Sequence, residues 1–178
     1  MKSKISQIIF CLLIFALTAF AQDKESQLID KFARISCGEF MARMQWIFIT
    51  SQDSPDSKIY VVYYGGRYRR ESLWNKKTNS LDKIRLKYPH REDGLNWAKS
   101  IPLYLTSGFV YKAKAPMSDK IVLINGGFRE DAQVEIWLVP KDGELPKPTP
   151  TIAEADIKFR DDKPSSVPNF TNCYYANQ

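Results

Sequence analysis

A helical pattern of apolar and polar residues begins near residue 36. Ser36-Cys37-Gly38-Glu39 is typical of a capping box, in which the serine oxygen accepts a hydrogen bond from the third amide and the glutamate reaches back. The apolar positions that follow at the spacing of one helical face are Phe40, Met41, Met44, Ile47 and Phe48. We therefore predict a helix from this cap to about Ser51, with its apolar stripe in the core.

Two further segments have the composition of buried strands. Residues 58–64 (KIYVVYY) are β-branched and aromatic without alternation, which predicts a central strand buried on both faces and stopped by Gly65-Gly66. Residues 121–124 predict a second buried strand. The chain is expected to leave this strand at Asn125-Gly126-Gly127, through backbone angles that glycine tolerates.

Alternation of apolar and polar positions predicts a third strand at residues 133–139, half-buried and ended by Pro140. Only residues 128–132 connect it to the preceding strand, so we expect the two to be antiparallel neighbours. The predicted sheet is thus built from 58–64, 121–125 and 133–139.

The intervening segments have mixed signals. Ile84, Leu86 and Tyr88 alternate with basic residues, as on a strand with one solvated face. Residues 93–106 have a helical pattern, but the ring of Pro102 would clash with the carbonyl four residues back. A kink or break between Ala98 and Pro102 is therefore expected.

The chain changes character after Pro140. Alternate prolines at 146, 148 and 150 predict an extended segment along the surface, acting as a tether rather than as a ligand for an aromatic groove. Residues 156–160 (DIKFR) predict one short edge strand. Residues 141–178 thus form a proline-rich segment, this strand and a tail that ends near Cys173.

The N-terminus is typical of a secretory signal peptide. Lys2 and Lys4 precede an apolar run at residues 8–20, and Ala19-Phe20-Ala21 is a small-x-small cleavage site. The run is short for a membrane span, although a retained anchor is the alternative. Cleavage after Ala21 would leave about 157 residues, enough for one domain, in the periplasm or outside the cell.

Cysteine usage is consistent with export. Cys11 leaves with the signal peptide, so Cys37 and Cys173 remain, and a pair in a secreted chain most simply forms a disulfide. The alternative is a catalytic thiol at Cys37 with His90 as its base, for which no motif is present. His90 is the only histidine, so no metal site and no cofactor are predicted.

Positive charge is concentrated in one segment. The whole chain has 26 Lys and Arg against 20 Asp and Glu, and loss of Lys2 and Lys4 leaves a net charge of +4. Residues 67–91 alone carry nine basic and two acidic residues, a net of +7, so the rest of the mature chain is acidic. We interpret residues 67–91 as a basic insertion in the domain.

This segment supplies the candidate binding residues. Arg67, Tyr68, Arg69 and Arg70 directly follow the central strand, where α/β sheets place ligand-binding loops. Guanidinium groups suit carboxylates and phosphates, Tyr68 offers a stacking surface, and Arg129 is a further candidate contact. The alternative is a solvated insertion without a ligand. Expected partners are peptidoglycan or another anionic envelope polymer, lipid head groups, or an envelope protein; an exported protein would rarely meet nucleic acid.

Catalytic motifs are sparse. The chain has no G-x-S-x-G, Walker or G-x-G-x-x-G pattern. Paired carboxylates such as Glu130 and Asp131 are usually solvated turn residues. We therefore expect a non-catalytic protein, with a secreted hydrolase using Glu130 or Asp131, or a structural protein-interaction module, as alternatives.

The order of these segments resembles the OmpA-like peptidoglycan-associated domain family over residues 37–140. The matching residues are 61–66, the Tyr104-Leu105 pair that ends 97–105, Gly126-Gly127-Phe128-Arg129-Glu130 within 120–130, and Val134-Glu135-Ile136. The resemblance implies one compact α/β (α+β) domain at residues 22–140, with a mixed sheet and helices packed on one face. It also implies an envelope location.

Two departures concern the ligand. The family binds the diaminopimelate of peptidoglycan through an aspartate after the glycine loop and an arginine in the next helix, where this chain has Arg67 and Trp97. The family's first strand, before the helix, is not evident, and we predict that DIKFR takes its place in the sheet. The overall expectation is an exported binding protein of the cell envelope.

Overall fold

Strands and helices follow one another in an order that partly matches the expectation. The computed structural model describes residues 25–75, 77–78, 80–106 and 117–162. The predicted signal peptide and Cys173 lie outside these residues, so cleavage after Ala21 and the Cys37–Cys173 disulfide stay predictions. The elements are β1 (Gln27–Phe32), α2 (Cys37–Gln52), β2 (Lys58–Gly66), β3 (Arg69–Asn75), β4 (Ser80–Lys87), α3 (Asp93–Ala98), α4 (Ser100–Thr106), β5 (Ile121–Arg129) and β6 (Gln133–Val139).

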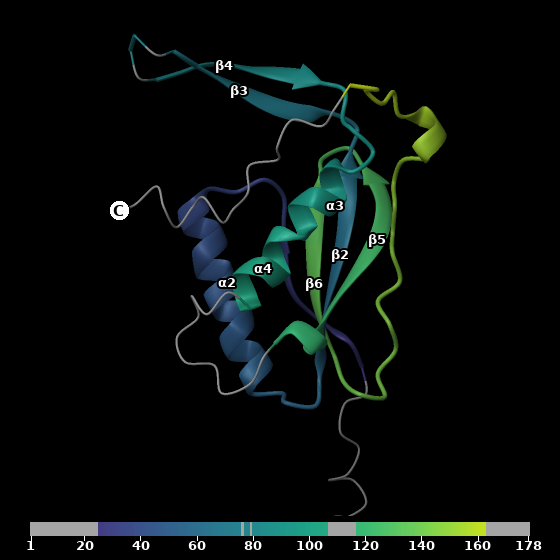
Figure 1. Ribbon diagram of the computed structural model, residues 1–178. Helices are drawn as coiled ribbons and strands as arrows, with labels where there is room; N and C mark the ends of the chain where they lie inside the picture. The colour runs from purple at the N-terminus through teal and green to yellow at the C-terminus, as the bar shows by residue number, and fades with distance from the viewer. Residues whose placement is uncertain (1–24, 76, 79, 107–116, 163–178) are drawn as a thin grey trace, which may run out of the picture.

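A four-stranded mixed sheet of order β1-β6-β2-β5 forms the centre of the fold (Figure 1). Strand β2 pairs parallel with β5 and antiparallel with β6, which pairs antiparallel with β1. The central position predicted for β2 is confirmed. The prediction that β5 and β6 are neighbours is wrong, because β2 lies between them. The three residues between them can span about 10 Å, two inter-strand spacings, so the connection can step across one strand.

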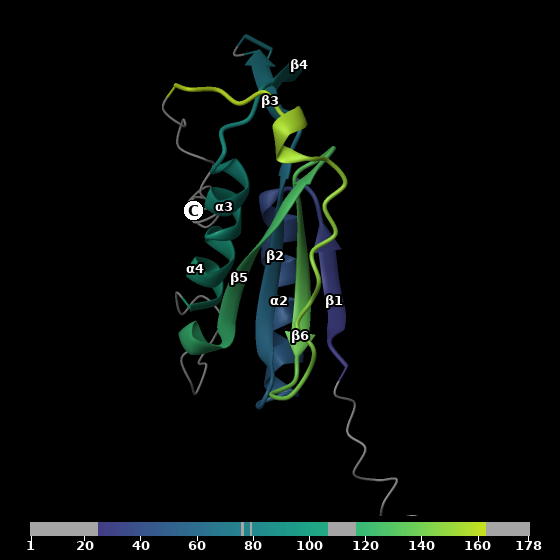
Figure 2. The same ribbon diagram turned by 90° about the vertical axis from the view of Figure 1, so that its right-hand side faces the viewer.

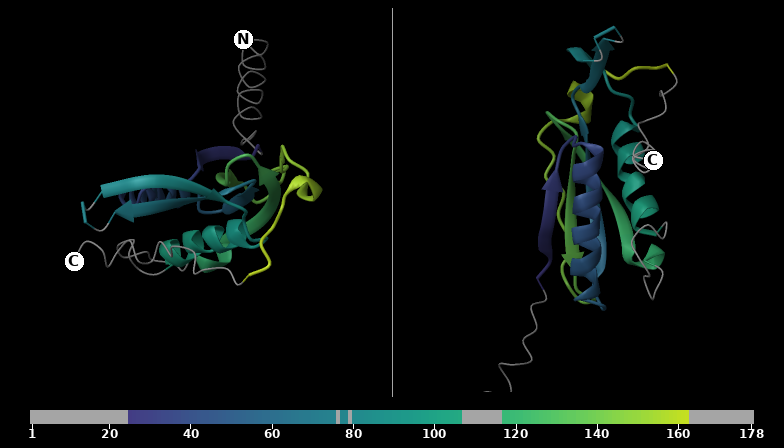
Figure 3. Two further views of the ribbon diagram at one scale, coloured as in Figure 1. Left: turned by 90° about the horizontal axis from the view of Figure 1, so that it is seen from above. Right: turned by 90° about the vertical axis from the view of Figure 1, so that its left-hand side faces the viewer.

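The helices α2, α3 and α4 cover one face of this sheet (Figures 1 and 3). The chain after Pro140 runs along the other face (Figure 2). This arrangement confirms the expected mixed α/β architecture. Residues that are buried between the helices and the sheet include Phe32, Phe40, Met44, Ile47, Ile59, Val61, Ile101, Leu105, Val134 and Ile136.

Helix α2 begins and ends where its sequence predicts. The Ser36 hydroxyl accepts a hydrogen bond from the Glu39 amide at 3.3 Å, which satisfies one of the free donors of the first turn. The Glu39 carboxylate pairs with Arg43 at 2.9 Å, one turn along the helix, rather than reaching back to the cap. The predicted break near Pro102 is also confirmed, since α3 ends at Ala98 and α4 starts at Ser100.

Strand β1 was not predicted, and it fills the sheet position that we had assigned to DIKFR. Its register against β6 shifts between Leu28 and Asp30, so a bulge at Ile29 interrupts the alternation that would identify a strand. The DIKFR prediction is wrong: residues 154–156 form a 3₁₀ turn and 157–160 belong to no strand. Ile157 is nevertheless buried, so its apolar character serves packing.

The two glycine pairs lie at different places in their strands. Gly65-Gly66 are the last two residues of β2, whereas β5 continues through Gly126-Gly127 to Arg129. A Cβ at Gly126 would lie 2.5 Å from Cε1 of Tyr64, and one at Gly65 would lie 2.5 Å from Cε1 of Phe128. Gly65 and Gly126 are therefore required by the aromatic rings packed over them. Gly127 has a φ of 84°, so the backbone angle that favours glycine is confirmed at this position.

We predict that Gly126→Ala lowers the free energy of unfolding by about 1–3 kcal/mol, the usual cost of overpacking, because the Tyr64 ring is held in place and cannot withdraw. Gly38→Ala is the matched control, since a Cβ there meets nothing within 4 Å and alanine favours the helix by up to about 1 kcal/mol. Chemical denaturation of both variants measures the difference. Equal stability of the two variants would contradict this account of Gly126.

Candidate functional site

The basic insertion folds as a β-hairpin that projects beyond the main sheet (Figure 1, upper part). Strands β3 and β4 form a separate two-stranded sheet in which Arg69 lies opposite Lys87 and Asn75 opposite Ser80. The strand predicted from the alternation at 83–88 is confirmed as β4. The expectation that only one of its faces is solvated is wrong, since Ile84 and Leu86 are 54% and 58% exposed and Lys83 and Arg85 on the other face are exposed as well. Within the described residues the hairpin pairs only with itself, so no packed layer covers these side chains.

The structure brings three of the candidate arginines together at the base of the hairpin, and each lies beside a carboxylate. Arg67 pairs with Glu130 at 3.2 Å, Arg69 with Asp93 at 3.7 Å and Arg70 with Asp131 at 2.9 Å. We call these three ion pairs the root pairs. They join the hairpin to the β5–β6 connection and to α3.

Backbone contacts strengthen the same junction. The Arg67 amide donates to the carbonyls of Arg129 at 3.0 Å and Glu130 at 3.2 Å, and the Arg34 guanidinium donates to the Arg70 carbonyl. These arginines therefore position the hairpin. The Arg70–Asp131 pair is more than half exposed on both sides, so it stabilises little and leaves Arg70 accessible to an anion.

Two more cations, Lys83 and Arg85, lie further out, on β4. Both are exposed and form no salt bridge within the described part of the chain, although Arg85 lies opposite Glu71 in the register of the hairpin. Lys87 pairs with Glu71 at 2.7 Å, and its hydrogen bond lowers the pKa of that carboxyl. The cluster Arg67–Arg70 stands out in the sequence because the carboxylates that pair with its arginines are distant along the chain. The signal that identifies Lys83 and Arg85 is their alternation with exposed apolar residues.

Tyr68, the predicted stacking surface, lies at the hairpin base. It is 41% exposed, and its ring centroid is 6.1 Å from that of Tyr88 at a tilt of 31°. The Lys158 ammonium lies 5.0 Å from the centroid of Tyr88. An aromatic pair with a cation beside it thus remains accessible to a ligand.

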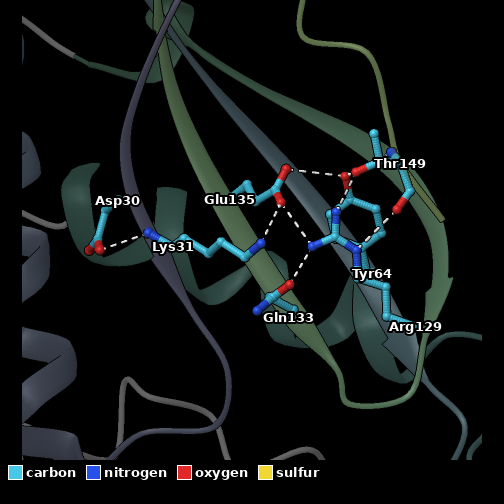
Figure 4. A network of polar contacts seen from close by, with 7 residues as sticks. All are labelled: Asp30, Lys31, Tyr64, Arg129, Gln133, Glu135 and Thr149. Carbon is cyan, nitrogen blue, oxygen red and sulfur yellow. Dashed lines mark hydrogen bonds and ion pairs between the residues drawn. The ribbon is translucent and has the colours of Figure 1, made fainter. Parts of the chain in front are cut away.

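Arg129 takes part in an internal network on the sheet face opposite the helices (Figure 4). Its guanidinium lies 3.5 Å from the centroid of the Tyr64 ring and donates to the Glu135 carboxylate at 2.8 Å. It also donates to the Thr149 carbonyl at 3.2 Å and the Thr149 hydroxyl at 2.6 Å. The Arg129 side chain is only 11% exposed. This residue therefore ties the proline-rich segment to the sheet, and most of its N–H donors already have acceptors within the protein.

Glu135 is the acceptor at the centre of that network. Its side chain is 8% exposed. In addition to Arg129, it accepts a hydrogen bond from Tyr64 Oη at 3.1 Å and pairs with Lys31 Nζ at 3.3 Å. Burial alone would raise the pKa of this carboxyl, but Arg129, Lys31 and Tyr64 together outweigh burial and lower the pKa. The carboxylate is thus held ionised inside the protein.

The residues considered for catalysis have other partners. His90 is buried, with Nδ1 3.5 Å from Asp93 and Nε2 3.2 Å from Asp162. The hydrogen bond from Arg160 lowers the pKa of Asp162 to about 2. Glu130 and Asp131 are exposed members of the root pairs. Among the described residues, no group of three or more His, Cys, Asp or Glu is placed to hold a metal ion.

A shallow groove lies between β1 and α2, apart from the hairpin. It is lined by Ile29, Asp30, Glu39, Ala42, Arg43 and Trp46. Arg43 crosses it and pairs with Asp30 at 2.5 Å and Glu39 at 2.9 Å. Its charges therefore satisfy one another, and the hairpin remains the stronger candidate site.

Comparison with known proteins adds no assignment. No family model matches the chain, and neither the curated proteins nor the solved structures include a match. Within the described residues, no helix has the length and apolar character needed to cross a membrane.

We predict that Glu135→Gln lowers the free energy of unfolding at neutral pH by about 3–5 kcal/mol, because it leaves the buried Arg129 cation without a counter-charge. The wild-type carboxyl has a lowered pKa in the folded state. Its contribution is therefore complete above the unfolded value of about 4.3 and is lost as the pH falls through the folded pKa.

Urea denaturation between neutral and acidic pH tests this prediction. Glu144→Gln is the matched control, since Glu144 is 88% exposed and 4.0 Å from Lys147, and its change should stay within about 0.5 kcal/mol. The stability difference between wild type and Glu135→Gln should shrink in acid. A difference that is independent of pH would contradict the assigned role of the ionised carboxylate.

Proposed function

We propose that this protein is an exported, non-catalytic binding protein of the cell envelope that recognises an anionic polymer through its β3–β4 hairpin. The observation that supports this proposal most directly is the distribution of ion pairs on the basic segment. The arginines at the base are paired within the protein, whereas Lys83 and Arg85 extend into solvent on a projecting element. Exposed cations on a projecting element favour contact with a large anionic partner.

The export component rests on the signal-peptide pattern of residues 1–21. The scaffold component rests on the OmpA-like resemblance. The strand before α2, which the sequence did not reveal, is present as β1, so one of the differences from that family disappears. The order strand, helix, strand, helix, strand, strand then runs through the domain, interrupted by the hairpin.

The family's ligand contacts are not the basis of the proposal. Arg67, at the position of the family's aspartate, pairs with Glu130, and Trp97 packs edge-on against Phe32 with ring centroids 5.9 Å apart. Both positions serve the fold. The proposed contact surface is therefore the hairpin, with peptidoglycan as the first polymer to test.

We predict that the chain from Gln22 to Gln178 is retained by insoluble peptidoglycan at low salt and released as salt rises, because salt screens contacts between exposed charges. Lys83→Glu/Arg85→Glu should abolish retention. Lys58→Glu/Lys141→Glu is the matched control, since it makes the same charge change at exposed lysines at the opposite end of the sheet.

Co-sedimentation across a salt series measures both effects. Equal loss of retention in the two double variants would indicate a net-charge effect and remove the hairpin from the proposal. Retention that resists salt and both variants would indicate a fitted pocket elsewhere. Absence of retention at every salt concentration would exclude peptidoglycan as the polymer.

A further inference from the structure

The hairpin has an apolar side as well as a cationic one. Successive residues of a strand point to opposite faces, so Ile84 and Leu86 lie on one side of β4, and Tyr88 directly follows the end of the strand. These side chains are 54%, 58% and 42% exposed. Tyr68 joins this side through its contact with Tyr88 at 6.1 Å. The hairpin therefore presents contiguous apolar and aromatic groups to solvent, a feature that usually marks an interaction surface.

Cations lie beside that apolar side and on the face behind it. Lys83 and Arg85 lie on the opposite side of β4, and their long side chains can extend around the edge of a two-stranded sheet. Arg70 lies opposite Leu86 in the register and is more than half exposed, and Lys158 lies 5.0 Å from the centroid of Tyr88. Arg70 and Lys158 thus border the apolar side directly, and Lys83 and Arg85 can reach its edge from the opposite face.

We propose that the hairpin is an amphipathic arm that docks on a lipid surface bearing anionic headgroups. The apolar side enters the boundary between headgroups and acyl chains, and the cations bind lipid phosphates. This inference rests on the proposed function, in that it uses the same hairpin and the same cations, and it specifies the partner.

The apolar side distinguishes a lipid surface from a soluble polyanion. A hydrated polymer would neutralise Lys83 and Arg85 but would leave Ile84 and Leu86 in water. Burial of exposed apolar side chains at a bilayer surface adds affinity in proportion to the area covered. The hairpin also projects, so it fits a flat surface better than it could enclose a ligand (Figures 1 and 2).

The root pairs would hold the arm during docking. They fix the base of the hairpin to α3 and to the β5–β6 connection, and the Arg67 amide adds two backbone hydrogen bonds. An isolated two-stranded hairpin is marginally stable in water. Anchoring the base allows the outer part to carry exposed apolar residues without collapsing onto the domain.

The test is co-sedimentation of the chain from Gln22 to Gln178 with phosphatidylcholine vesicles, prepared with and without phosphatidylglycerol. We expect binding only when phosphatidylglycerol is present. Ile84→Ser/Leu86→Ser should weaken it by about tenfold or more. Lys83→Glu/Arg85→Glu should weaken it by at least about fivefold for each residue. Leu103→Ser/Leu145→Ser, at exposed leucines outside the hairpin, should leave it unchanged.

Each result supports or overturns the inference. Binding that depends on phosphatidylglycerol but is unaffected by Ile84→Ser/Leu86→Ser would show a purely electrostatic contact and overturn the apolar docking. Retention by peptidoglycan without vesicle binding would overturn the inference and leave the proposed function standing. Failure with both partners would overturn the inference and also exclude peptidoglycan as the polymer of the proposed function. Thermal unfolding of each variant checks the fold, and Leu86→Ser alone serves if the double variant unfolds.

Discussion

The buried carboxylate of Glu135 is the constraint on which the sheet depends. An ionised group inside a protein is costly unless charged and hydrogen-bonding partners surround it. Glu135 lies on β6, and its partners Lys31, Tyr64 and Arg129 come from β1, β2 and β5. Each strand of the sheet thus contributes one group to a single site. A shift of one residue in any strand would turn its partner to the other face, so the network specifies the register of all four strands.

The same network explains features that have no local cause. Strand β5 continues beyond its apolar run at residues 121–124 as far as Arg129, whose side chain contacts Glu135 and Thr149. The Tyr64 ring, held between Arg129 and the β5 backbone, excludes any side chain at Gly126. Thr149 also donates its amide to the Tyr64 hydroxyl, which fixes the proline-rich segment across the sheet. Gly126 is therefore a glycine because the Tyr64 ring leaves no room for a Cβ, and not because the strand ends there.

Sequence alone predicted the elements whose determinants are local. The cap at Ser36 and the apolar stripe behind it define α2, the uniform apolar run defines β2, and Pro102 divides two helices. The sequence failed where the determinants are distant. The bulge at Ile29 conceals β1, and the order of β5 and β6 depends on β2 lying between them. The partners of the root arginines are 24 to 63 positions away in sequence, so counting charges along the segment could not reveal them.

Separating paired from unpaired cations changes the interpretation of the basic segment. Nine basic residues in 67–91 suggest an anion site centred on the arginines after β2. In the fold, those arginines lie where the hairpin meets the domain, beside Glu130, Asp93 and Asp131, and the Arg67 amide adds two backbone hydrogen bonds there. Most of the basic residues near β2 therefore have carboxylate partners within the protein. Contacts within the protein do not account for the outer part of the hairpin, where Lys83 and Arg85 alternate with the exposed Ile84 and Leu86. Exposed apolar groups add little stability to the isolated domain, so their position beside Lys83 and Arg85 fits the proposed partner that is both apolar and anionic.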